Sequence, residues 1–83
     1  MADSVIPKPM RLKKRSFSIA GHRTSVALEP EFWAALENEA HQRNLSLAAL
    51  VASIDTVRAE RNLASALRVH VLSRALEKSS SSS

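Results

Sequence analysis

Half of the chain's cationic side chains are concentrated near its N-terminus. Six of the twelve lysine and arginine residues lie within the first 24 positions, where Asp3 is the only carboxylate. They are Lys8, Arg11, Lys13, Lys14, Arg15 and Arg23. Ammonium and guanidinium groups at this density attract polyanions, because each of them can neutralise a phosphate. This concentration of positive charge therefore predicts a polyanionic partner, and nucleic acid is the first candidate.

One short strand follows these cations. In residues 23–28 the side chains alternate between two faces, with period two. The face predicted to turn toward a core carries Thr24, Val26 and Leu28, and the outward face carries Arg23, Ser25 and Ala27. The strand therefore presents one cation and one hydroxyl away from the core.

Three helices are expected after the strand, over residues 30–43, 47–60 and 63–78. Pro30 suits the first turn of a helix, whereas Ser46 and Asn62 are N-cap residues of the next two. Asn44 can take the left-handed conformation that ends a helix. Apolar residues cover a broad arc of the last helix, which indicates contacts on two of its sides.

The size of the chain predicts one domain, whose small hydrophobic core needs an additional source of stability. Of its 83 residues we expect a flexible basic arm over 1–14, the folded domain over 15–78 and a disordered serine tail over 79–83. Such a small core is marginal alone, and the absence of cysteine excludes disulfides, so we expect a homodimer or a higher oligomer.

Several functional classes are not expected. The three histidines lack the spacing of a metal site, and we expect no cofactor. There is no cysteine nucleophile and only one glycine, so no catalytic site or phosphate loop is indicated. No apolar stretch approaches the length of a membrane span or a secretory signal, and we expect a cytoplasmic protein.

The strand needs a partner strand, because an isolated strand leaves half of its backbone groups unpaired. Two partner strands are consistent with the sequence. The strand of a second subunit could pair with it across a two-fold axis, which also enlarges the core. Alternatively, residues 16–28 could form a hairpin with a two-residue turn at Gly21-His22, which places Phe17 and Ile19 on the face of Thr24 and Val26. We favour the intermolecular pairing.

The order of strand, helix beginning at proline and serine-capped helix, preceded by basic residues, resembles the ribbon-helix-helix family of bacterial DNA-binding proteins. The segments that carry the resemblance are residues 14–33 (KRSFSIAGHRTSVALEPEFW), 45–55 (LSLAALVASID) and 62–68 (NLASALR). They are similar to a subgroup described only as a ribbon-helix-helix domain. The expected fold class is thus mainly helical, a ribbon-helix-helix dimer with an intermolecular antiparallel ribbon and a third, C-terminal helix.

The resemblance implies roles for particular residues in a transcriptional regulator. In the family a two-stranded ribbon enters the major groove, so base contacts are expected from Arg23, Ser25 and Ala27. Phosphate contacts are expected from the arm, the turn and the start of the second helix: Arg11, Lys13, Lys14, Arg15, His22, Ser46, Leu47 and Ala48. The dimer core would contain Val26, Leu28, Phe32, Leu36, Leu50, Val51 and Ile54.

The third helix is a departure from the usual family fold, and it supports a different function. The same dimer could be an interaction module that docks a protein partner on this helix, or an antitoxin that combines both roles. The hairpin also bears on DNA binding. Two hairpins side by side would make a sheet four strands wide, at about 4.8 Å per strand, which is too broad for the groove.

Overall fold

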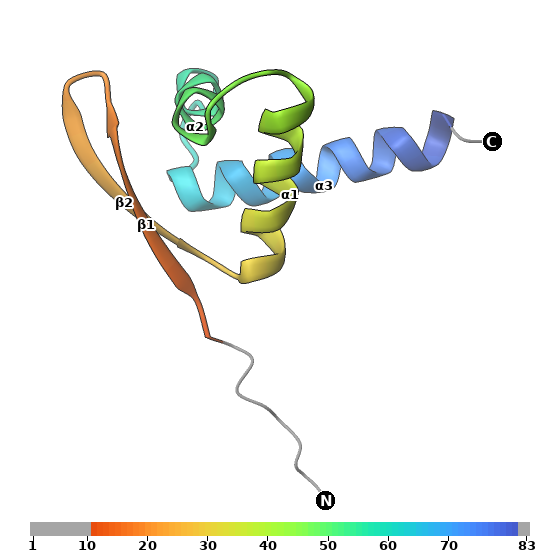
Figure 1. Cartoon of the computed structure of the whole chain (residues 1–83), viewed down its shortest axis with the longest axis horizontal. Coiled ribbons are helices and arrows are strands. Elements are labelled where there is room, and N and C mark those ends of the chain that lie inside the picture. Colours follow the sequence, from red (N-terminus) through yellow and green to blue (C-terminus); the bar gives the residue numbers. More distant parts are fainter. Residues whose placement is uncertain (1–10, 82–83) are drawn as a thin grey trace, which may run out of the picture.

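A β-hairpin lies on one side of three helices in the computed structural model, which describes residues 11–81 and the side chains of residues 11–78 (Figure 1). The elements are β1 (Lys13–Ile19), β2 (His22–Leu28), α1 (Pro30–Gln42), α2 (Leu47–Thr56) and α3 (Leu63–Ser81). The fold class is therefore confirmed as a mainly helical chain with an N-terminal β-ribbon and an additional C-terminal helix. Most of the expected arm, residues 1–10, lies outside the described residues, as does the end of the expected tail, 82–83.

The ribbon differs from the single strand that we expected, because β2 pairs with β1 of its own chain. The two strands are antiparallel, and every residue from Lys13 to Ile19 has a partner in β2. This is the hairpin that the sequence left open as the alternative to intermolecular pairing. It satisfies one edge of β2 without a second subunit, since the backbone donors and acceptors of that edge bond to β1.

The hairpin turn lies one residue earlier than predicted, at Ala20-Gly21. Both residues have positive φ angles, 53° and 81°, as a type I′ turn requires. Moving the turn by one residue shifts each cross-strand partner by two positions, so Phe17 pairs with Thr24 and Ile19 with His22. Because a strand alternates with period two, the predicted faces are unchanged.

Local sequence signals start the helices where they were expected. Pro30 occupies the first turn of α1, and Asn44 takes a left-handed φ of 57° after that helix ends. The hydroxyl of Ser46 accepts a hydrogen bond of 3.0 Å from the N–H of Ala49 and caps α2. The carbonyl of the Asn62 side chain accepts one of 2.8 Å from the N–H of Ser65 and caps α3.

The ends of two helices differ from the expected ones. α2 ends at Thr56, four residues before the expected end at residue 60, and Ala59 adopts a left-handed φ of 58° in the connection to α3. α3 continues to Ser81, three residues into the segment that we expected as a tail. None of the helices in the described part is long and apolar enough to cross a bilayer.

The core closes within one chain, because α3 and the helix-facing side of the hairpin both cover α1 and α2. The buried apolar residues are Ile19, Val26, Leu28, Trp33, Leu36, Ala40, Leu50, Val51, Ile54, Ala66 and Leu67. Six of the seven residues expected in a dimer core are in this set, and Phe32 packs against it as a partly buried side chain. Leu67 is fully buried, so α3 contributes to the core of its own chain.

Candidate nucleic-acid interface

The outward face of the hairpin brings Arg23, Ser25 and Ala27 together, as the alternation in the sequence predicted. Arg23 and Ser25 are exposed and Ala27 is half-buried. Their neighbours on β1 were not predicted as part of this face. The register pairs Ser18 with Arg23, Ser16 with Ser25, and Lys14 with Ala27, and all three β1 residues are exposed. The face therefore has two rows of side chains.

Two hydroxyl groups touch at the centre of this face. The Oγ atoms of Ser16 and Ser25 lie 3.0 Å apart, a hydrogen-bonding distance at which either can donate. The pair joins the strands through side chains as well as through the backbone. It also holds both hydroxyls at the surface, where they are available to a further polar group.

The hairpin is positively charged because it contains no acidic residues. Residues 11–28 contain five lysines and arginines and no aspartate or glutamate. The acidic residue that follows β2, Glu29, is ion-paired with Arg68 of α3 at 3.0 Å. The pKa of Glu29 is lowered: a backbone hydrogen bond has the largest effect, burial opposes it, and the hydrogen bond and charge of Arg68 lower the pKa further. The hairpin therefore carries uncompensated positive charge.

Arg15 is held on the other face of the hairpin, toward the helices. Its guanidinium lies 2.5 Å from the Glu37 carboxylate of α1 and 5.2 Å from the centre of the Trp33 ring. The Trp33 indole in turn donates a 2.7 Å hydrogen bond to the carbonyl of Lys13. We therefore interpret Arg15 as a residue that fastens β1 to α1, because its charge is already compensated.

The other expected phosphate contacts lie on three separate elements. Arg11, Lys13 and Lys14 are exposed at the start of β1, and His22 is exposed beside the turn at the opposite end of the hairpin. Ser46 caps α2, so its hydroxyl is used by Ala49. The N–H groups of Leu47 and Ala48 belong to the first turn, whose donors have no intrahelical acceptor. The helix start thus retains donors for an anion.

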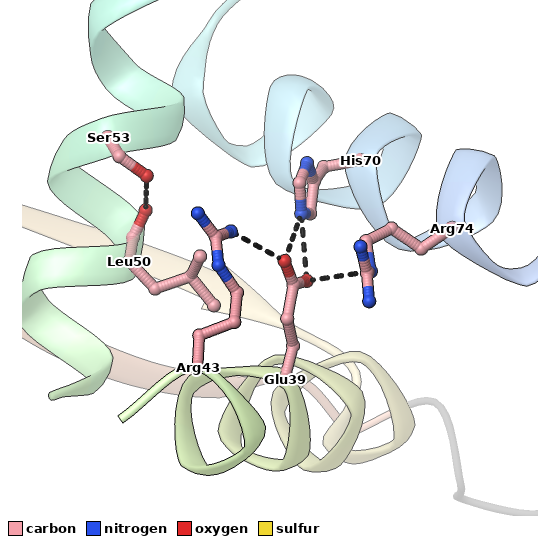
Figure 2. A network of polar contacts seen from close by, with 6 residues as sticks. All are labelled: Glu39, Arg43, Leu50, Ser53, His70 and Arg74. Carbon is pink, nitrogen blue, oxygen red and sulfur yellow. Dashed lines mark hydrogen bonds and ion pairs between the residues drawn. The ribbon is translucent and has the colours of Figure 1, made fainter. Parts of the chain in front are cut away.

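A cluster of polar side chains around one buried carboxylate was not predicted from the sequence. Glu39 of α1 is only 6% exposed, and it contacts Arg43 and two residues of α3, His70 and Arg74 (Figure 2). Arg43 donates to it at 2.9 Å, and Nε2 of His70 lies 2.8 and 3.0 Å from its two oxygens. The sequence did indicate that this carboxylate is buried, because Glu39 lies three residues after Leu36 on the apolar stripe of α1.

The Glu39 carboxylate is ionised at neutral pH. Burial alone raises the pKa of Glu39, but hydrogen bonds from Arg43 and His70 and the charges of His70 and Arg74 outweigh it, so the pKa falls below the ordinary 4.5. An ionised carboxylate only accepts hydrogen bonds, so the Nε2 atom of His70 carries the proton that it donates. The cluster joins α1 to α3.

We expect the Glu39→Gln variant to be less stable at pH 7 by about 1–3 kcal/mol. This loss is smaller than that expected for a fully buried ion pair, because Arg43 is solvent-exposed. The lowered pKa means that this contribution is present above the unfolded pKa and disappears as pH falls through the folded one. Urea unfolding at pH 7 and at several pH values below 4.5 measures both effects. Glu77→Gln, at an exposed position of α3, is the control; equal acid sensitivity of the wild type and Glu39→Gln would contradict the assignment.

The fold and this face define a small β-ribbon and helix domain with a cationic outer surface. The chain belongs to the ribbon-helix-helix domain family, whose model matches residues 12–75. Membership implies a DNA-binding, regulatory type of function, and such domains are typically non-enzymatic and bind DNA as dimers. Neither the curated proteins nor the solved structures contain a significant match to the chain.

Proposed function

We propose that this protein is a homodimeric transcriptional regulator that binds double-stranded DNA through the outward face of its hairpin. The observation that carries the proposal is a ribbon face of serines and cations without a single acidic residue between positions 11 and 28. Two strands are about 4.8 Å apart, and a major groove about 12 Å wide admits such a ribbon. DNA binding would place the protein in the cytoplasm.

Each group on the face has a chemical role in this proposal. Arg23 bridges the O6 and N7 acceptors of a guanine, Ser25 donates to or accepts from a base edge, and the methyl group of Ala27 contacts a thymine methyl. Exposed cations and the free N–H groups at the start of α2 hold the phosphates. These contacts come from Arg11, Lys13, Lys14, His22, Ser46, Leu47 and Ala48.

The proposal is tested by selecting duplexes from a random pool with the purified protein. A short enriched sequence that persists at 200 mM salt is the expected result, because base contacts add to the phosphate term. Binding without enrichment, or no binding, would contradict a sequence-specific regulator.

An apolar stripe on α3 is the surface that we propose a second copy covers. Val69, Leu72 and Leu76 are 37%, 54% and 69% exposed, and their spacing of three and four residues puts them on one side of the helix. The half of α3 that carries Leu76 extends away from the hairpin (Figure 1). Since β2 already has a partner strand and a four-stranded sheet is too wide for the groove, a dimer joined through α3 agrees better with DNA binding than one joined through β2.

Leu72→Glu is expected to convert the dimer to a monomer of 9.1 kDa, because it places a charge in the apolar contact. Sedimentation equilibrium measures the mass, and Ser73→Glu, at the neighbouring exposed residue, is the control. A Leu72→Glu protein that remains dimeric would move the interface elsewhere. A monomeric wild type would contradict the homodimer and favour the second candidate, a module or antitoxin whose α3 stripe binds a different protein.

A further inference from the structure

The six outward positions of the hairpin all come from one chain. In the family's usual arrangement each of two subunits contributes one strand to the ribbon, so the second row of side chains belongs to the partner. Here the second row belongs to β1 of the same chain, with Ser16 and Ser18 directly opposite Ser25 and Arg23. A single protomer thus holds both strands of a ribbon that fits the groove.

The surroundings of β2 agree with a ribbon of two strands. The edge of β2 that does not face β1 borders a groove of about 360 Å³, lined by Thr24–Ala27, by Asn62, which caps α3, and by the first residues of that helix, Leu63 and Ala64. The start of α3 therefore lies beside the edge where a further strand would be added. One hairpin is also the widest sheet that the major groove accepts.

The contact between Ser16 and Ser25 gives the two rows a shared chemistry. Each hydroxyl has one O–H group, and the 3.0 Å contact uses one of the two. The pair is left with one free donor and with acceptor lone pairs at the surface. If either serine becomes alanine, the remaining hydroxyl is released and can still reach a base edge. The two serines therefore act as one polar unit.

Cations lie toward the two ends of this unit. Lys14 is near the start of β1, and Arg23 is opposite Ser18, near the turn. Lys14 and Ser18 are four positions apart on the strand, a distance of roughly 13 Å. The cations can thus contact the DNA while the serine pair lies between them over the base edges.

We propose that the hairpin of one protomer is a complete DNA-reading ribbon, in which Ser16 and Ser18 of β1 read bases together with Arg23 and Ser25 of β2. This inference rests on the proposed function, and it adds two specificity-determining residues to it. Each protomer of a dimer then reads its own stretch of groove, without a strand from its partner.

The test compares base preference and affinity among the intact protein and its Ser16→Ala, Ser25→Ala and doubly substituted variants. Random-pool selection gives the preference, and fluorescence anisotropy on the enriched duplex gives the affinity. The Arg23→Ala variant tests the proposed function itself, because Arg23 is expected to contact a base whether or not β1 does. Ser73→Ala, at an exposed serine on α3, is the matched control. Thermal unfolding by circular dichroism shows that each variant is folded at the temperature of the binding measurement.

We expect Ser16→Ala to change the preference at one base pair and to weaken binding by roughly two- to tenfold, the value of one net hydrogen bond. The double variant should lose more than the product of the two single losses, because neither hydroxyl remains to replace the other. Ser73→Ala should bind as the wild type does.

The outcomes separate the inference from the function on which it rests. If Arg23→Ala alters the preference and Ser16→Ala leaves it unchanged, β1 does not read bases and the inference is overturned. An equal loss of affinity for all duplexes after Ser16→Ala overturns it as well. If the wild-type protein enriches no sequence, the proposed function is itself wrong and the inference falls with it.

Discussion

Val26→Glu is expected to unfold the domain, whereas Ser25→Glu, at the neighbouring residue, should leave it folded. Val26 is 5% exposed within the core, so the variant buries a carboxylate without a partner. This costs several kcal/mol, a large part of the 5–15 kcal/mol that stabilises a typical domain. Ser25 is exposed on the opposite face, and the cost of its substitution should stay within about 0.5 kcal/mol.

The Ser25→Glu variant should bind DNA more weakly, although it remains folded. A carboxylate in the centre of the ribbon opposes the phosphates and the acceptors of the base edges. Like charges that meet in an interface cost several kcal/mol, so we expect affinity to fall at least about 30-fold. Urea unfolding and anisotropy measure the two quantities. A stable Val26→Glu protein would contradict the predicted faces of β2, and so would an unfolded Ser25→Glu protein.

Raising the salt concentration from 50 to 200 mM is expected to weaken DNA binding by about 10³–10⁵-fold, if six to ten phosphates are neutralised per dimer. Four described cations per chain are available for this on the hairpin and just before it: Arg11, Lys13, Lys14 and Arg23. The helix N-termini add further phosphate contacts without a formal charge. Anisotropy titrations at several salt concentrations give the slope of log K against log salt.

A pair of variants then separates free cations from the paired one. Replacing both Lys13 and Lys14 by glutamine removes four charges from a dimer and should reduce the slope by about 3–4. Arg15→Gln should leave the slope nearly unchanged, because that guanidinium is already paired with Glu37. If Arg15→Gln reduced the slope as much per charge, Arg15 would be a phosphate contact after all.

The clearest successes of the sequence come from local signals. The positions of Pro30, Ser46 and Asn62 start the three helices, because caps and fixed φ angles act within one turn of backbone. The alternation in residues 23–28 assigns the faces of β2, and this assignment holds for either strand pairing, since both depend on the same period of two.

Other features depend on which distant segments meet. The end of α2 lies earlier than the amphipathic pattern indicates, because the chain turns at Ala59 to bring α3 back onto the core. Glu39 is an acidic residue on an apolar stripe, and its charge is compensated by Arg43 of its own helix and by His70 and Arg74, which approach from α3. Arg15 belongs to a run of cations in the sequence, yet its position on the helix-facing side of β1 pairs it with α1.

The class of fold, the cationic character of the N-terminal segment and the outward direction of Arg23, Ser25 and Ala27 could be predicted from the sequence. These follow from periodicity, capping and charge, which are local properties of the chain. The pairing of β2 with β1, and the contact of Ser16 with Ser25 on the outer face, became evident from the three-dimensional structure. Both strand pairings satisfy the same pattern, and the choice between them depends on long-range packing, in which β1 and α3 close the core of a single chain.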